Sequence, residues 1–302
     1  DTSDAWIVER TGVRERRIAG ADETTASLGV AAGAAALKRA GMAPGDVDLL
    51  LVATTTPEQP VPETSAFVHG GLGLTCGAFD VGAACSGFVY GLVAGSLLLV
   101  GGGLETVLVV GAETLTRIMD FTDRQTCVLF GDAAGAVVLS AAEGPDAPGL
   151  LAWDLGCDGS GTALIELRAG GSRLPTSPAT LAAGEHWVKM DGPEVFRRAV
   201  RIIVTSASRT LERAGVALEE VDLFVPHQAN ARILAAAAGR LGIEPGRVVT
   251  NIDRYGNTSA ASIPLALVEA AEDGRLREGH LVLLTAFGAG MTWASALLRW
   301  GR

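Results

Sequence analysis

Cys85 is the residue of this sequence whose surroundings best suit a nucleophile. It lies in the segment FDVGAACSGFVYG (residues 79–91), where a short strand is expected to end in small residues and a long apolar helix to begin directly after the cysteine. The free N–H groups and the positive macrodipole at a helix N-terminus stabilise a thiolate, so we expect the Cys85 pKa to fall below its ordinary value of about 8.5. Small neighbours leave room for a substrate carbonyl, and the predicted chemistry is acyl transfer through a cysteine.

Two polar side chains and a glycine-rich turn could complete such a site. His227 stands in VDLFVPHQANARI (residues 221–233), at the C-terminal end of an apolar strand, where parallel sheets meet their ligands. Asn257 follows the glycine of a turn in NIDRYGNTSAASIP (residues 251–264), from which its amide could donate into a cleft. The small residues of Phe287–Gly290, after the final predicted strand, permit the close approach that an oxyanion-binding N–H needs.

An internal duplication indicates how these residues are positioned. Leu37–Leu49 (LKRAGMAPGDVDL) and Leu211–Leu223 (LERAGVALEEVDL) are offset by 174 residues and identical at eight of thirteen positions. Each copy reads as the end of an amphipathic helix, a glycine stop and a turn into an apolar strand. The same offset places Val107–Gly111 on Leu281–Thr285, two apolar runs typical of strands covered on both faces. The sequence therefore predicts two similar α/β halves.

We assign residues 1–145 to an N-terminal half that carries the cysteine and residues 146–302 to a C-terminal half that carries His227 and Asn257. Residues 156–186, rich in Gly, Ser and Pro, are expected to form an inserted loop over the site. Packing of the two halves through their helices would alternate helix and sheet layers. Because the position that matches His227 at the repeat offset is Ala53, the chemistry is expected in a single cleft shared by the halves.

Composition narrows the class of protein. The 302 residues are 48% hydrophobic and 19% charged, enough for a large core, and the net charge of −10 argues against a general nucleic-acid binder. Four cysteines without a CxxC pair favour reduced thiols and a cytoplasmic location. The apolar run Phe88–Val100 is shorter than a bilayer span and is interpreted as a buried helix, and no export leader is recognised, so no membrane association is expected.

The motifs, taken in order, resemble the β-ketoacyl-acyl-carrier-protein synthase III family of thiolase-superfamily condensing enzymes. They are DTSDAWIVERTGVRERR at the start, then TDRQTCVLFGDAAGA, PHQANARI, YGNTSAASIP and FGAGMTW, and they span nearly the whole chain. The resemblance implies a duplicated five-layer αβαβα fold and a homodimer. In the family a strand precedes the DTSDAW motif, so we expect the sequence to lack an N-terminal piece.

By this resemblance, Cys85 takes an acyl group from acyl-CoA while the backbone N–H groups of Cys85 and Ala289 hold the oxyanion. Malonyl-acyl-carrier-protein then loses CO2, and His227 and Asn257 stabilise the enolate that attacks the acyl-cysteine to give a 3-oxoacyl product. Decarboxylation forms the carbanion without a base, and the sequence shows no metal or dinucleotide signature. No cofactor is therefore expected, since acyl-CoA is a substrate.

The resemblance also implies where the two substrates bind. Trp6 and Arg124 would sandwich the CoA adenine, with Arg10 on phosphate and Asn230 nearby. Val61 would reach across the dimer to end the partner's acyl pocket, and its size suggests starters larger than acetyl. Because carrier proteins are acidic, a cluster of arginines is the candidate docking face. The cluster comprises Arg197, Arg198, Arg201, Arg232 and Arg240.

Other enzymes of the superfamily and one non-catalytic relative remain as alternatives. A priming ketosynthase or acyltransferase of a polyketide pathway would keep Cys85 and CoA binding but use another acceptor. A thiolase or hydroxymethylglutaryl-CoA synthase is less favoured, because thiolases need a second catalytic cysteine near the C-terminus and the last one here is Cys157. A non-catalytic chain-length factor would not need the reactive cysteine.

Overall fold

Both copies of the repeated segment fold as the sequence predicts. In the computed structural model, which describes residues 2–142, 144 and 147–301, helices α2 (Thr25–Ala40) and α6 (Gly192–Ala214) each end at a left-handed glycine. These are Gly41, with φ of 68°, and Gly215, with φ of 66°, and no L-residue adopts such angles as readily. Each glycine leads through a short 3-10 turn into a buried strand, so the predicted repeat is confirmed.

The N-terminal half builds a four-stranded sheet in the order β2-β1-β3-β4. β1 runs parallel to β2 and to β3, and β4 runs antiparallel to β3. Leu51 at the middle of β1 aligns with Phe79 on one side and Val109 on the other. The elements of this half are α1 (Asp4–Thr11), α2, β1 (Leu49–Ala53), α3 (Thr64–Leu72), β2 (Gly77–Val81), α4 (Gly87–Gly102), β3 (Thr106–Thr114) and β4 (Asp132–Ser140).

The C-terminal half repeats this arrangement in a sheet of order β5-β10-β9-β8. β8 is parallel to β9, and β10 is antiparallel to both β9 and β5, so β8-β9-β10 corresponds to β1-β3-β4. The elements are β5 (Gly149–Gly161), β6 (Ile165–Glu166), α5 (Pro178–Ala182), β7 (Lys189–Met190), α6, β8 (Leu223–Pro226), α7 (Ala231–Leu241), α8 (Ile252–Tyr255), α9 (Ser262–Glu272), β9 (Leu281–Gly288) and β10 (Gly290–Arg299).

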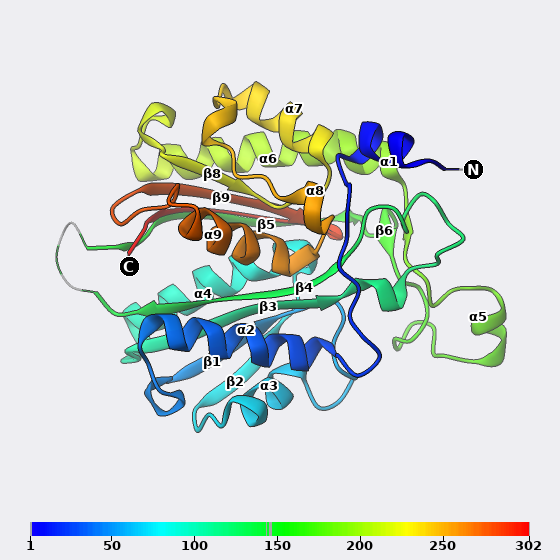
Figure 1. Ribbon diagram of the computed structural model, residues 1–302, viewed down its shortest axis with the longest axis horizontal. Helices are drawn as coiled ribbons and strands as arrows, with labels where there is room; N and C mark the ends of the chain where they lie inside the picture. The colour runs from blue at the N-terminus through cyan, green and yellow to red at the C-terminus, as the bar shows by residue number, and fades with distance from the viewer. Residues whose placement is uncertain (1, 143, 145–146, 302) are drawn as a thin grey trace.

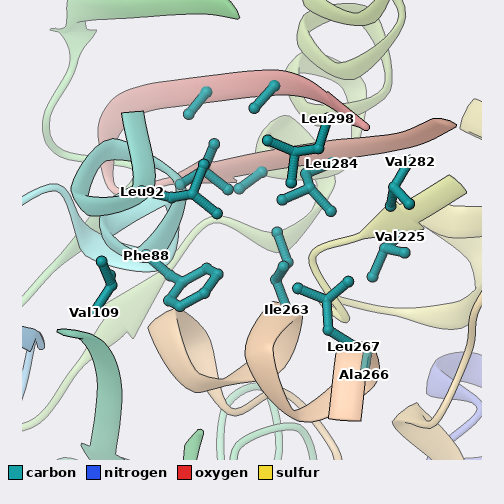
Figure 2. Close-up of a cluster of buried hydrophobic side chains, with 14 of the residues drawn as sticks. Phe88, Leu92, Val109, Val225, Ile263, Ala266, Leu267, Val282, Leu284 and Leu298 are labelled. Carbon is teal, nitrogen blue, oxygen red and sulfur yellow. The ribbon is translucent and has the colours of Figure 1, made fainter. Parts of the chain in front are cut away.

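Five layers of helix and sheet result, as the αβαβα prediction requires (Figure 1). α2 and α3 cover the outer face of the first sheet, α6 and α7 cover the outer face of the second, and α4 and α9 lie between the sheets. Side chains of both middle helices meet strand residues from both sheets in one core (Figure 2). Phe88 and Leu92 of α4 and Leu267 of α9 are each about 1% exposed, and such burial contributes roughly 1.5–3 kcal/mol per side chain.

The apolar run that begins at Phe88 is a helix between the two sheets, as predicted. Residues Ala84–Gly101 are long and apolar enough to cross a bilayer by length and composition alone. However, α4 packs on β1 and β3 of one sheet and on β5 and β10 of the other. Its apolar character is explained by a core flanked by two sheets, although Leu97 and Leu98 near its end are exposed.

Three features of the prediction differ from the structure or lie outside it. β5 continues to Gly161, so the first residues of the predicted 156–186 loop are strand; Gly156 permits this pairing, because a Cβ there would lie 2.1 Å from the ring of Trp293 on β10. Phe287–Gly290 joins β9 to β10 as a hairpin instead of following the last strand. The predicted boundary between residues 145 and 146 lies outside the described residues.

Candidate functional site

A cavity of about 640 Å³ lies where the two halves meet. The N-terminal half contributes Thr55 and Cys85 to its wall, and the C-terminal half contributes His227, Asn257 and Ala289. All of these except Asn257, which follows the short helix α8, come after the end of a strand, at the edge of an α/β sheet where ligands generally bind. The predicted single shared cleft is therefore present, and it brings the three predicted catalytic residues together.

The chain presents Cys85 to this cavity on a sharp turn. β2 ends at Val81, and a 3-10 turn over Ala84–Ser86 leads directly into α4. Ala84 has φ of 48°, a left-handed conformation that costs free energy in any residue but glycine. The Thr292 hydroxyl donates to the Ala83 carbonyl at 2.9 Å and holds the turn against β10. The predicted position of Cys85, at the start of a helix, is confirmed.

The β9–β10 hairpin approaches the backbone of Cys85 closely. A Cβ at Gly288 would lie 2.7 Å from the Cys85 nitrogen, so only glycine fits that position. The next residue, Ala289, lines the cavity beside Cys85. The predicted pair of oxyanion donors, the N–H groups of Cys85 and Ala289, thus belongs to two segments that lie in contact.

The expected lowering of the Cys85 pKa is wrong for the free protein. Cys85 opens onto the cavity, but protein atoms surround its sulfur, and burial raises the pKa of the thiol to about 12. The Ser259 hydroxyl opposes this shift, whereas the nearby Glu113 carboxyl adds to it. The sequence suggested the helix N-terminus but could not reveal this desolvation. Cys85 is therefore a protonated thiol at neutral pH before substrate binds.

His227 is a buried, neutral hydrogen-bond donor. It is 2% exposed, and burial lowers its pKa to about 3. Its Nδ1 lies 2.7 Å from the Ser262 hydroxyl, which also accepts the Gln228 N–H at 3.4 Å. A hydroxyl that accepts from Gln228 is free to donate its own hydrogen to Nδ1. On this basis we assign the proton of the neutral ring to Nε2, and the ring packs edge-on against Phe287 with 5.7 Å between ring centroids.

Asn257 is held so that its NH2 group is the part left for a ligand. Its backbone N–H donates to the Leu129 carbonyl at 2.8 Å, and its own carbonyl accepts from Gly131 at 3.0 Å. The side-chain Oδ1 accepts the Ser259 N–H at 2.9 Å. Since Asn257 is 6% exposed and lines the cavity, Nδ2 is a second neutral donor there, as predicted.

At the outer part of the cavity, two guanidinium groups lie on one indole ring. The Arg10 and Arg124 side chains lie 4.9 Å and 5.3 Å from the Trp6 ring centroid. Asn230 caps α7 by accepting the Arg232 N–H at 2.9 Å and donates to the Arg10 carbonyl at 3.2 Å. The four predicted CoA-contacting residues therefore lie together, and Asn230 is already engaged in joining α7 to α1.

The five predicted docking arginines have different surroundings. Arg197 pairs with Glu194 in the preceding turn of α6, and half-buried Arg198 pairs with Glu194 at 2.8 Å and with Asp158 at 3.3 Å. Arg198 thus joins α6 to β5, which limits its availability to a partner.

The remaining docking candidates are exposed on the outer helices. Arg201 lies on α6, Arg240 lies in the last turn of α7, and the Arg232 guanidinium lies 5.7 Å from the Phe196 ring centroid. Arg197 and Arg232 also line the cavity, so they mark its mouth.

Val61 stands apart from the cavity of its own chain. It is 78% exposed on the segment between β1 and α3 and is not among the residues that line the cavity. It therefore cannot shape this pocket from within one chain.

Sequence reasoning missed three polar residues behind the site: Ser262 on His227, and Ser259 and Glu113 behind Cys85. Ser259 and Ser262 lie in the quoted YGNTSAASIP motif, which was their available signal. Nothing local marked Glu113, which is a single acidic residue within an apolar strand.

Comparison with known proteins agrees with this geometry. The family "3-Oxoacyl-[acyl-carrier-protein (ACP)] synthase III" matches residues 79–159, and its C-terminal region matches residues 211–300. The β-ketoacyl-[acyl-carrier-protein] synthase III of Symbiobacterium thermophilum is 48% identical over 303 residues, covering 100% of this chain and 91% of that protein.

Solved structures are similarly close. The 3-oxoacyl-(acyl carrier protein) synthase III of Pseudomonas aeruginosa PAO1 superposes with a TM-score of 0.92 at 44% identity, covering 100% of this chain and 91% of the other. The priming β-ketosynthase of the R1128 polyketide pathway gives 0.91 at 37% identity, covering 99% and 88%. The duplicated fold and its cysteine-lined cavity define an acyl-transferring enzyme of the thiolase fold. Within that class, the chain belongs to the 3-oxoacyl-[acyl-carrier-protein] synthase III family.

Proposed function

We propose that this enzyme condenses an acyl-CoA starter with malonyl-acyl-carrier-protein to form 3-oxoacyl-acyl-carrier-protein, which initiates fatty-acid synthesis. The observation that carries the proposal is the convergence of a thiol and two neutral donors on one cavity, with Cys85, His227 and Asn257 supplied by different segments. The reaction uses no cofactor, since both carbon units arrive as thioesters.

The first half-reaction transfers the acyl group to Cys85. The sulfur attacks the thioester carbonyl, the negative oxygen is held by the N–H groups of Cys85 and Ala289, and the CoA sulfur leaves. Cys85 loses a proton and CoA gains one, so protons balance over the step. Because burial holds the pKa of free Cys85 near 12, proton loss is part of this half-reaction and does not precede it.

The second half-reaction forms the carbon–carbon bond. Loss of CO2 from the malonyl group leaves an enolate, whose oxygen accepts hydrogen bonds from His227 Nε2 and Asn257 Nδ2. The enolate carbon attacks the acyl carbonyl, the bond to Cys85 breaks, and the released thiolate takes a proton from water. Two neutral donors suit this step, because a protonated histidine would transfer its proton to the enolate oxygen, whereas a neutral donor stabilises the negative charge by hydrogen bonding.

We infer that Trp6, Arg10 and Arg124 bind the CoA nucleotide at the cavity mouth. The Arg124 guanidinium already lies over the indole ring, so it would have to move outward for an adenine to enter between them. Arg197 and Arg232, at the same mouth, are the best placed of the five arginines to meet an acidic carrier protein, with Arg201 and Arg240 farther along the exposed helices.

The enzyme is proposed to act as a homodimer joined at strand β2. Within the described residues β2 pairs only with β1, and the helices on its two sides also expose apolar side chains. These exposed residues are Phe67 on α3, Phe79 on β2 and Leu97 on α4. A partner strand on this edge would cover them, and Val61 nearby could then reach the partner's acyl pocket. The modest size of Val61 favours starters larger than acetyl.

Size-exclusion chromatography with light scattering tests this assembly. Phe79→Lys is expected to give a monomer, whereas Ile18→Lys, at an exposed apolar position elsewhere, is the matched control and is expected to stay dimeric. A wild-type monomer would refute the proposed dimer. A cytoplasmic location is also proposed, because all four cysteines are free thiols.

Intact-mass spectrometry with a panel of acyl-CoAs, followed by malonyl-acyl-carrier-protein, tests the function. Wild-type enzyme is expected to gain an acyl adduct that Cys85→Ala does not, and malonyl-acyl-carrier-protein should consume the adduct and release CO2. The similarity to a priming β-ketosynthase favours one alternative, in which the same chemistry primes a polyketide pathway. An adduct that persists with malonyl-acyl-carrier-protein and moves to another acceptor would favour an acyltransferase of such a pathway.

A further inference from the structure

Glu113 is a buried acidic residue directly behind the site. It lies near the end of β3 and is 0% exposed. Within the described part of the chain, no Lys, Arg or His forms an ion pair with it. A buried carboxyl group without a cation is costly unless hydrogen bonds compensate, so its contacts should explain its presence.

Seven hydrogen bonds to this carboxyl group all come from N–H or hydroxyl groups. Oε1 accepts from the Thr55 N–H at 3.1 Å, the Thr55 hydroxyl at 2.8 Å and the Ala260 N–H at 3.3 Å. Oε2 accepts from the Thr55 N–H at 3.0 Å, from the Thr56 N–H and hydroxyl at 3.1 Å and 2.7 Å, and from the Thr54 hydroxyl at 3.3 Å. Burial raises the pKa of the Glu113 carboxyl group, whereas the hydrogen bonds from Thr56, Thr55 and Ser259 lower it. Because backbone N–H groups can only donate and both oxygens accept from them, we take the group to be an ionised carboxylate.

These contacts connect Glu113 to the wall of the cavity. Thr55 and Ser259 both line the cavity next to Cys85, and their hydroxyl oxygens are 3.2 Å apart. The Ser259 hydroxyl in turn lowers the pKa of the Cys85 thiol, and the Ser259 N–H donates to the Asn257 side chain at 2.9 Å. One carboxylate thus joins the segment after β1 to the turn that precedes α9, with the nucleophile above both.

We propose that Glu113 is a positioning residue that joins residues 54–56 to the Ser259–Ala260 turn beneath Cys85 and places a fixed negative charge behind the nucleophile. The proposal rests on Cys85 being the reactive cysteine of the proposed function. The charge opposes formation of the thiolate in the empty site, and the Ser259 hydroxyl partly offsets this effect. Glu113 lies behind the cavity wall, and the titratable side chain that lines the cavity near Cys85 is His227, which is neutral and is not altered in the variants below.

Alkylation of Cys85 tests the charge without any need for condensation activity. The rate with iodoacetamide is measured by intact mass across pH, with Cys85→Ala to identify the site of modification. Glu113→Gln keeps the size of the side chain but removes its charge. Its curve of alkylation rate against pH is expected to shift to lower pH by about one unit. At a fixed pH, thiolate is then about tenfold more abundant but less nucleophilic, which gives a net increase in rate of about threefold.

Two further variants separate the charge from the structural connection. Glu113→Asp keeps the charge, so its alkylation profile is expected to remain close to wild type even where the weakened connection lowers kcat. Asp154→Asn removes another buried acid, in the second sheet, and is expected to leave the profile unchanged. If Glu113 only supported the fold, Gln and Asp would alter alkylation alike.

A profile for folded Glu113→Gln that superposes on wild type would overturn the proposal. If Glu113→Gln does not fold, Ser259→Ala provides the test: with the offsetting hydroxyl gone, Cys85 faces the carboxylate directly, and alkylation should slow about threefold at fixed pH. An unchanged rate in Ser259→Ala would equally refute the inference. Since wild-type condensation is measured separately, either failure can be distinguished from failure of the proposed function.

Discussion

Replacing Asn257 by Asp removes a single hydrogen-bond donor from the site and keeps the surrounding structure. The Asn257 Oδ1 accepts the Ser259 N–H at 2.9 Å, and an aspartate oxygen can do the same. The backbone contacts to Leu129 and Gly131 do not involve the side chain. What changes is Nδ2, which becomes an oxygen without a hydrogen and carries negative charge where the enolate would form.

The expected loss follows from the role of one oxyanion donor. Removing such a donor typically lowers the rate 10²–10³-fold, about 3–4 kcal/mol of transition-state stabilisation. Asn257→Asp should lose at least this much in the condensation step, because it also adds repulsion. Asn257→Ala should lower the condensation rate by a similar factor without adding repulsion. It also leaves the buried Ser259 N–H without an acceptor, which should cost about 1–3 kcal/mol of folding stability. Acidic pH should partly rescue Asn257→Asp alone, since a protonated carboxyl group can donate.

A single-turnover experiment isolates the step. The enzyme is loaded with an acyl group from acyl-CoA, freed of excess CoA, and mixed with malonyl-acyl-carrier-protein while the acyl adduct is followed by intact mass. Loading of both variants is expected to stay within about threefold of wild type, and consumption of the adduct to fall by the factor above. Consumption by Asn257→Asp within tenfold of wild type, or an equal fall in loading and consumption, would refute the donor role.

Three other predictions follow from the contacts. Burial places the pKa of His227 near 3 in the folded protein against 6.5 unfolded, so the unfolded chain binds a proton that the folded chain does not. Stability should fall between pH 6.5 and 3 by up to about 1.4 kcal/mol per unit, and urea unfolding of His227→Gln should lack this part of the slope. Ser262→Ala frees the His227 tautomer and should slow condensation about tenfold while acyl loading is kept; equal effects on both half-reactions would contradict the assigned tautomer. Gly156→Val places a side chain in the Trp293 ring and should lower the free energy of unfolding by about 1–3 kcal/mol or more, and a chemical denaturation midpoint equal to wild type would contradict the described packing.

The sequence predicted the architecture because its signals are local and duplicated. The glycine stops at Gly41 and Gly215 and the apolar runs that became β3 and β9 are each legible within a dozen residues, and finding them twice removed the ambiguity of a single short run. One prediction was wrong because a long-range contact decided the outcome. β5 extends into the predicted loop because β10, more than a hundred residues later, pairs with it.

The candidate site shows the same contrast between features that local segments reveal and features that distant contacts decide. Cys85, His227 and Asn257 were found because each sits in a distinctive local segment at the end of a strand or in a turn. The protonation states of these residues were not predicted, because they depend on groups distant in sequence. Ser262 lies 35 residues from His227, and partners of Glu113 lie 58 residues before it and 147 residues after it. For this reason the sequence predicted a thiolate at Cys85, whereas the structure indicates a protonated thiol.

By itself, then, the sequence determined the duplicated fold, the family and the choice of three candidate catalytic side chains, since these depend on residue type and near neighbours. The tertiary structure decided the protonation of Cys85 and His227, the orientation of the Asn257 amide and the presence of a buried carboxylate behind the nucleophile. Desolvation and hydrogen bonding are set by every atom packed around a group, and those atoms come from both halves of the chain.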